Sequence, residues 1–265
     1  MYFVAMALTL AHARRDKPLS AADGPHAHAA VMRAISDIDP DAGRTLHDMR
    51  AHKRIAIAII GGEARGAILR LTFMAADGLA HAHTLAGALA ARPSLRLGDA
   101  ACAVESVDLA HPVWSGVGTW ADLLSGDPAR RMRLTFATPT AIMKRGGDGS
   151  RFTSLYPDPS DVFSGLARRW RSLDGPPLPE DLDGFVRAGG CVVSGHDLRT
   201  DTFRADGRAQ IGFVGHANYE CRGGTARHIV ALNALARLAF WGGIGYQTAR
   251  GMGAVRVEIA GEVQS

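Results

Sequence analysis

A glycine-rich segment near the C-terminus constrains the fold of this chain more than any other feature. It covers residues 242–253 and reads Gly-Gly-Ile-Gly-Tyr-Gln-Thr-Ala-Arg-Gly-Met-Gly. An apolar helical pattern leads into it over residues 226–241, and a β-branched alternation, Val255-Arg256-Val257, follows it. Because glycine tolerates positive φ angles and close backbone approach, we expect a compact loop between a helix and a strand.

The order of these elements limits what the loop can bind. Unpaired amides in such a loop, with Thr248 and Arg250 beside them, could hold phosphate groups. Dinucleotide and P-loop sites run from a strand through the glycine loop into a helix. Here the order is helix, loop, strand, and no GK[ST] motif is present. The pattern therefore disfavours a mononucleotide site.

The rest of the chain predicts two similar halves. In the first, apolar periodicity predicts strands over 2–10, 55–60, 66–74 and within 95–109, and helices over 28–38 and 79–91. Residues 111–118 are expected to be a linker, followed by a short helix at 119–124. In the second half we expect strands at 131–140, 191–194, 200–203, 210–219 and 254–259, and helices at 160–170, 182–188 and 226–241.

Each half thus has the element order β-α-β-β-α-β, which is the ferredoxin-like pattern. We predict an α+β chain of two tandem ferredoxin-like domains, residues 1–125 and 126–265, with the glycine-rich loop in the second. The 265 residues and an apolar content of 47% are sufficient for two cores.

Charge and cysteine usage narrow the class of protein. The formal net charge is +4 and the isoelectric point is near 9.2, which is compatible with a nucleic-acid partner. Arginine far outnumbers lysine, which suits bidentate phosphate contacts, although GC-rich coding gives the same bias. Three cysteines without CxxC spacing predict neither a zinc site nor a disulfide framework, and fit a reducing cytoplasm. The apolar N-terminal ten residues are too short to span a membrane, so no membrane association is expected.

Four segments, in this order, resemble the CRISPR-associated pre-crRNA-processing endoribonucleases of the RAMP superfamily. They are Leu-Thr-Phe-x-Thr-Pro-Thr at 134–140, Val-Phe-x-x-Leu-x-x-Arg-Trp at 162–170, Gly-Phe-x-Gly at 212–215 and the loop at 242–253. Agreement in the N-terminal half rests on Leu46-His47, with Lys53 six residues later. The resemblance implies two ferredoxin-like domains that bind repeat-derived RNA and cut it once per repeat, with no cofactor.

RNA can be cut without a metal ion when an imidazole moves protons and a cation stabilises the phosphorane. The family often uses a histidine in the region of His47, so His47 and Lys53 are the expected catalytic pair. His26, His28 and His52 are weaker candidates. Some members add a tyrosine, for which this chain has no counterpart near the first helix. No metal site is expected, because His26 and His28 have a spacing that separates them on a helix and no acid cluster accompanies them.

The expected RNA-binding residues lie in the loop and in one predicted basic hairpin. Those in the loop are Gly243, Gly245, Tyr246, Gln247, Thr248, Arg250, Gly251 and Gly253; those in the hairpin are Lys144 and Arg145. Arg168, Arg169 and Arg171 are expected on a solvated helix face beside a core tryptophan, Trp170. The aromatic signature of RNA-recognition sheets is absent, which favours contacts to the RNA backbone and grooves.

Two alternatives stay open at this point. The chain could be a non-catalytic RAMP subunit that binds crRNA inside an effector complex, or a nucleotide-binding ferredoxin-like protein. The expected partners are CRISPR repeat RNA and other CRISPR effector subunits, with the chain a monomer or a homodimer.

Overall fold

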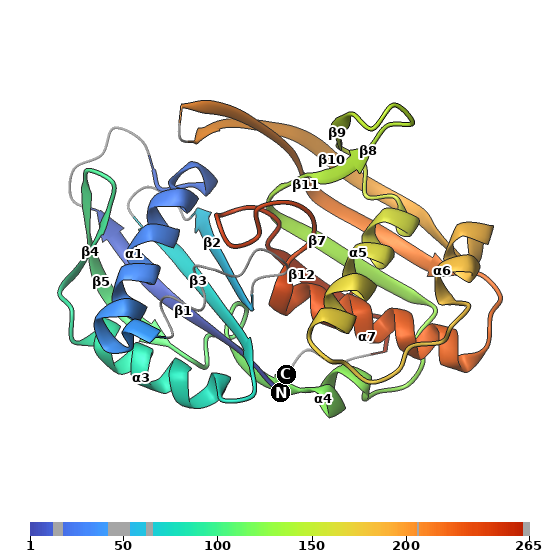
Figure 1. Cartoon of the computed structure of the whole chain (residues 1–265), viewed down its shortest axis with the longest axis horizontal. Coiled ribbons are helices and arrows are strands. Elements are labelled where there is room, and N and C mark those ends of the chain that lie inside the picture. The colour runs from blue at the N-terminus through green and yellow to red at the C-terminus, as the bar shows by residue number, and fades with distance from the viewer. Residues whose placement is uncertain (13–17, 42–53, 62–65, 206, 262–265) are drawn as a thin grey trace. The chain divides into compact units, whose positions relative to one another are not determined.

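A computed structural model of the chain describes residues 1–12, 18–41, 54–61, 66–205 and 207–261 (Figure 1). The chain divides into two compact units. Unit 1 comprises Met1–Thr119, Phe203–Gln210 and Gln247–Met252, and unit 2 comprises Trp120–Thr202, Ile211–Tyr246 and Gly253–Ser265. The division predicted after residue 125 did not include the two short segments 203–210 and 247–252 in the first unit.

Unit 1 is built on an antiparallel sheet in which β1 is central. The strands are β1 (Tyr2–His12), β2 (Ile55–Gly61), β3 (Gly66–Ala75), β4 (Ser94–Leu97), β5 (Ala100–Asp108) and β6 (Gly116–Thr119). The sheet order is β2-β3-β1-β5-β4, and β6 pairs with the first residues of β1. The outer strand β2 runs antiparallel to β3, with Ile57 opposite Leu71.

Two helices, α1 (Gly24–Ile38) and α3 (Gly78–Ala90), cover one face of this sheet (Figure 1). Alternate residues of β1, such as Leu8 and Leu10, are fully buried with Val31 of α1 and Leu85 of α3 in one apolar core. The side chains on one face of the strands therefore pack against the apolar faces of the two helices in a single layer.

Unit 2 repeats this arrangement. Its sheet has the order β10-β11-β7-β12, with strands β7 (Arg131–Thr140), β10 (Cys191–Ala205), β11 (Arg208–Cys221) and β12 (Val255–Ile259). Helices α5 (Pro159–Ser172) and α7 (Ala226–Gly242) pack on each other and on one face of the sheet (Figure 1). The smaller elements are α4 (Trp120–Leu124), the hairpin strands β8 (Ile142–Arg145) and β9 (Arg151–Ser154), α6 (Leu182–Phe185) and a helical turn over Val186–Gly190.

The predicted α+β class and the ferredoxin-like element order are confirmed, because both units show β-α-β-β-α-β with the strand order of that fold. Three details differ. The expected linker contains β6, which pairs with β1. The two strands expected over 191–203 are one continuous edge strand, β10, whose polar side chains do not interrupt its pairing. Helix α1 begins at Gly24, earlier than expected, because Pro25 suits a first helical turn.

Candidate active site

The glycine-rich loop has the backbone that its composition predicted. Gly243, Gly245, Gly251 and Gly253 have φ angles of 71°, 85°, 102° and 72°. These values fall in the left-handed region, where a side chain would be strained. Gln247 is also left-handed, with φ at 56°, so a residue with a side chain occupies one of the tight positions. The backbone conformation of the loop therefore depends on glycine at these four positions.

The centre of the loop, residues 247–252, is held by the outer strand β2. The amide of Ile57 donates to the Thr248 carbonyl, and the Ile57 carbonyl accepts from the Gly251 amide, both at 3.0 Å. Ala249 is buried in the apolar core of unit 1. Because β2 is the outer strand of its sheet, the amide and carbonyl of Ile57 are not used within the sheet. The loop bonds to both groups, as an additional strand would.

The same part of the loop lies against the first turn of α1. A Cβ atom at Gly24 would be 2.6 Å from the Gly251 Cα atom, and one at Gly251 would be 2.8 Å from the Gly24 Cα atom. Real Cβ atoms do not approach so closely, so both positions depend on glycine. The contact fixes which face of α1 meets the loop.

The structure separates the two histidines of α1. His28 is half-buried and lies one helical turn after Gly24, so it shares the face of α1 that meets the loop. His26 is exposed, and its ring lies over Gly98, where a Cβ would be 2.9 Å from Cε1. Among the histidines that the structure describes on α1, His28 is thus the one on the loop side.

The expected catalytic pair, His47 and Lys53, and the candidate His52 lie outside the described residues. The described chain ends at Asp41 and resumes at Arg54, whose carbonyl accepts from the Met74 amide. Their catalytic roles stay predictions.

The loop amides are less available than we expected from its composition. Gly243, Gly251 and Gly253 donate to the carbonyls of Ala239, Ile57 and Pro139 at 2.9 to 3.1 Å. The Ile244 amide donates to Gly253 and the Tyr246 amide to Ala141. A run of unpaired amides is therefore not present at these positions, because the loop uses them to hold its own shape. The side chains of the loop are therefore better placed than these amides to meet a ligand.

Tyr246 and Arg250 are the side chains best placed for that role. Tyr246 is 45% exposed and Arg250 is partly exposed. Gln247 is partly exposed as well, whereas Thr248 is 9% exposed. Of the four predicted loop side chains, Thr248 is the one that the fold buries.

Arg169 corrects the expectation of a solvated arginine face on α5. It is 8% exposed and donates through Nη1 to the carbonyls of Gly242 and Gly243, the latter at 3.0 Å. Burial lowers the pKa of its guanidinium to about 10, which leaves it charged at neutral pH. Arg168 and Arg171 are exposed as predicted. The sequence pattern did not distinguish Arg169 from its neighbours, because it does not indicate that the C-terminal end of α7 contacts α5.

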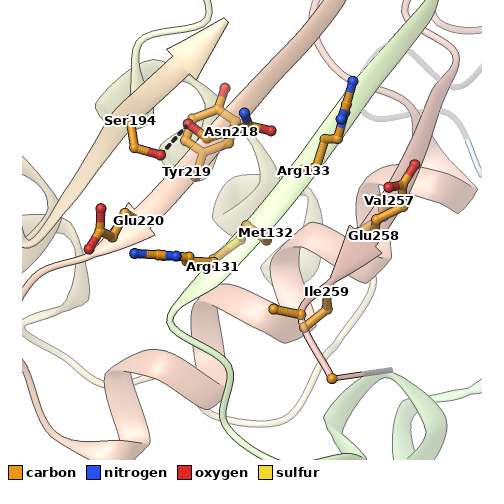
Figure 2. Close-up of a pocket in the computed structure, with 12 residues that line it drawn as sticks. Arg131, Met132, Arg133, Ser194, Asn218, Tyr219, Glu220, Val257, Glu258 and Ile259 are labelled. Carbon is orange, nitrogen blue, oxygen red and sulfur yellow. Dashed lines mark hydrogen bonds between the residues drawn. The ribbon is translucent and has the colours of Figure 1, made fainter. Parts of the chain in front are cut away.

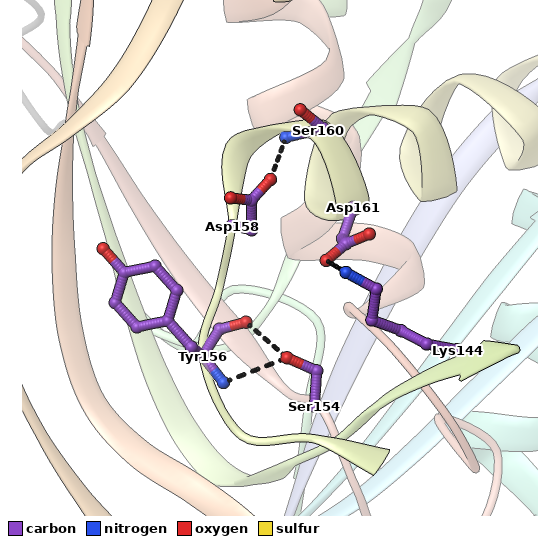
Figure 3. A network of polar contacts seen from close by, with 6 residues as sticks. All are labelled: Lys144, Ser154, Tyr156, Asp158, Ser160 and Asp161. Atoms are coloured by element: carbon purple, nitrogen blue, oxygen red, sulfur yellow. Dashed lines mark hydrogen bonds and ion pairs between the residues drawn. The ribbon is translucent and has the colours of Figure 1, made fainter. Parts of the chain in front are cut away.

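The predicted basic hairpin is present as β8 and β9. Lys144 forms an ion pair with Asp161 of α5 at 2.8 Å, and Arg145 is exposed (Figure 3). The hydrogen bond from Asp161 raises the pKa of the Lys144 ammonium. Of the two predicted hairpin residues, Lys144 is therefore ion-paired and Arg145 is open to solvent.

Unit 2 also has a hollow of about 860 Å³ on its sheet (Figure 2). Arg131 and Arg133 of β7 line it, opposite Glu220 and Asn218 of β11 in the strand register. Glu258 of β12 also lies opposite Arg133. Acidic and basic groups alternate here, so the hollow carries no strong charge of one sign.

Over the described residues, no three histidine, cysteine or acidic side chains come together as a metal site would require. In the same residues, no helix has the length and apolar character needed to cross a membrane.

The protein-family model for the CRISPR-associated endoribonuclease Cas6 matches residues 134–255, which include all four of the motifs described above. Solved Cas6 structures resemble the whole chain. A Cas6 product complex shares 24% identity at a TM-score of 0.84, and a second Cas6 product complex shares 27% identity at 0.78. Each covers 97% of this chain and 100% of its own. Residues 134–255 are thus similar to the Cas6 family, and the chain as a whole has the fold of the Cas6 structures. A Thermus thermophilus Cas6 at 22% identity has the same fold, with a TM-score of 0.74 over 97% of this chain and 98% of its own. No curated protein gives a significant match.

Proposed function

We propose that this chain is a Cas6-like endoribonuclease that binds CRISPR repeat RNA and cuts pre-crRNA within each repeat. The observation that carries the proposal is the Cas6 product complex at 27% identity, because the similarity covers 97% of this chain and all of that one. A match of that extent includes both units and the glycine-rich loop, not a shared fold in one half alone.

The proposed chemistry uses the RNA's own 2′-hydroxyl as the nucleophile. A base takes the 2′-OH proton, the 2′-oxygen bonds to the adjacent phosphorus, and the bond from phosphorus to the 5′-oxygen breaks. An acid then protonates the leaving 5′-oxygen, which yields a 2′,3′-cyclic phosphate and a 5′-hydroxyl. One proton is taken from the RNA and one is returned to it, so the step balances without a metal ion.

We assign the proton transfers to His47 and the stabilisation of phosphorane charge to Lys53. Imidazole exchanges protons near neutral pH and an ammonium supplies fixed positive charge. His28 is the first alternative to His47, since it shares the face of α1 that meets residues 250–251 of the loop. His26, over Gly98, and His52 are the remaining alternatives.

RNA binding is assigned to the loop and the hairpin. Tyr246, Gln247 and Arg250 offer exposed or partly exposed side chains, and Arg145 an exposed guanidinium. The loop glycines and Thr248 act by giving the loop its shape. We further propose a cytoplasmic location, since Cys191 and Cys221 lie in the same unit and are not joined by a disulfide.

The test is incubation of the purified protein with labelled repeat RNA from the CRISPR array of the same genome, in the presence of chelator. We expect one cut per repeat. Binding without any cut would instead identify a non-catalytic RNA-binding subunit. Loss of repeat binding together with saturable binding of ATP or NAD would favour a nucleotide-binding protein.

A further inference from the structure

Two arginines face each other at the tip of the β8–β9 hairpin. Arg145 and Arg151 are direct partners in the antiparallel register, so their side chains leave the same face of the hairpin. Both are exposed. Among the described residues, no carboxylate lies within ion-pairing distance of either guanidinium. Like charges directly opposite in a strand pair are unfavourable, and an anion bound between them would remove the repulsion.

The rest of this face carries no negative charge. The next pair on the same face is Met143 and Thr153, both exposed. The nearest acid in sequence is Asp148, in the turn, and its carboxylate accepts from the Ser150 amide at 2.9 Å. Hydrogen bonds from the side chain and the amide of Ser150 lower the pKa of the Asp148 carboxyl, so this acid is ionised and bound within its own turn.

The hairpin is held in place before any ligand binds. Lys144, whose side chain leaves the other face, is tied to Asp161 near the start of α5 (Figure 3). Asp158 caps the same helix through the Ser160 amide at 2.9 Å. At the tip, the Gly146 amide donates to the Ser150 carbonyl at 2.8 Å. An arm fixed in this way loses little conformational entropy when it binds.

We propose that Arg145 and Arg151 together clamp backbone phosphates of the repeat RNA, and that Lys144 orients the clamp through Asp161 without touching RNA. The inference rests on the proposed function and adds Arg151, a residue that the sequence pattern did not indicate. It also gives Lys144 a positioning role in place of the predicted RNA contact. Guanidinium groups suit this site because they bind phosphate oxygens in pairs.

The experiment measures the affinity for repeat RNA as a function of salt concentration. The RNA carries a 2′-deoxy substitution 5′ of the mapped cut, so that it stays intact. Each phosphate contact contributes about 0.7 to 0.9 to the slope of log K against log salt. Arg145→Ala and Arg151→Ala should each reduce the slope by about that amount, and the double variant by about 1.4 to 1.8. Arg145→Lys and Arg151→Lys should keep the slope, because they keep the charge.

Three further variants separate the clamp from its support. Arg187→Ala, at an exposed arginine on another part of unit 2, should change neither the slope nor the affinity. Lys144→Ala should weaken binding but keep the slope, and Lys144→Arg should restore the affinity. Asp161→Asn should also weaken binding, although it removes a negative charge that would otherwise repel RNA.

An unchanged slope in the double variant overturns the clamp. If the wild-type protein still cuts repeat RNA, the proposed function stands despite that result. A slope lowered by Lys144→Ala overturns the positioning role, because it means that Lys144 reaches phosphate itself. Tighter binding by Asp161→Asn overturns it as well, because RNA binding then does not need the ion pair. A wild type that neither binds nor cuts repeat RNA overturns the inference and the proposed function together. Thermal unfolding of each variant confirms that it is folded.

Discussion

Gly24 and Gly251 meet with no room for a side chain on either. A Cβ atom at Gly24 would lie 2.6 Å from the Gly251 Cα atom, although 227 positions separate the two residues in the sequence. Gly24 opens α1, the helix that carries His28, and Gly251 belongs to the loop segment held by Ile57. The seat of the loop therefore depends on glycine at both positions.

Replacing Gly24 tests this seat. Gly24→Ala should lower the stability by about 1 to 3 kcal/mol, the cost of overpacking, and should slow RNA cleavage by displacing the loop. Gly87→Ala is the matched control, since Gly87 also lies in a helix but has nothing within 4 Å of an added Cβ. That variant should gain about 0.5 to 1 kcal/mol. Urea unfolding and single-turnover cleavage measure both effects, and equal behaviour of the two variants would refute the tight contact.

Arg169 supports the other end of the loop, where α7 terminates. Arg169→Met removes the donor to the Gly242 and Gly243 carbonyls, and each lost charge-assisted bond costs about 1.5 to 3 kcal/mol. We expect a loss of about 2 to 4 kcal/mol overall, because the thioether still fills space. Arg168→Met, at the exposed neighbour, should change the stability by less than about 0.5 kcal/mol. Thermal or urea unfolding decides between them, and a fully stable Arg169→Met protein would contradict the buried contact.

The histidines can be ranked by single-turnover cleavage. His47→Ala should slow the reaction by about 10²- to 10⁴-fold, the usual contribution of a general acid or base. Lys53→Ala should cost less, since the proton transfers remain. His26→Ala should have little effect, because the His26 ring lies over Gly98. If His47→Ala is fully active, the role passes first to His28, and His28→Ala should then show the large loss.

The start of α7 gives a prediction on pH. Asp181 accepts from His228 at 2.9 Å, and that hydrogen bond lowers the pKa of the Asp181 carboxyl. A carboxyl whose pKa is lower in the folded state stabilises the fold above its unfolded pKa of about 3.9, and this contribution is lost as the pH falls through the folded value. Asp181→Asn should therefore lower the melting temperature at pH 7, and the difference from wild type should shrink below about pH 4. Asp127→Asn, at an exposed acid, is the control, and a pH-independent difference for Asp181→Asn would rule out the linkage.

The element order was predictable from the sequence because it depends on local periodicity. The apolar run of β1 and the apolar stripe of α5 are each a signal within one element, and each appears in the structure as expected. The left-handed glycines of the loop were predictable for the same reason, since the backbone need belongs to each residue alone.

The surroundings of the site were not predictable, because they depend on pairs far apart in the chain. Nothing near Arg169 indicates that it would meet Gly242, and nothing near Gly24 indicates Gly251. The pairing of loop amides with Ile57 and Pro139 likewise removed phosphate contacts that composition alone had suggested. Sequence patterns therefore predicted the loop and its shape, whereas the partners of its groups required the fold.

The chemistry of the cut RNA ends tests the proposed cleavage mechanism most directly. Repeat RNA is cleaved by the wild-type protein in chelator, and the fragments are analysed by mass and by end-labelling. We predict a 2′,3′-cyclic phosphate on the upstream fragment, a 5′-hydroxyl on the downstream fragment, and no cleavage when the 2′-oxygen 5′ of the cut is absent. Products with a 3′-hydroxyl and a 5′-phosphate, or a 2′-deoxy substrate cut at the normal rate, would contradict the proposed mechanism.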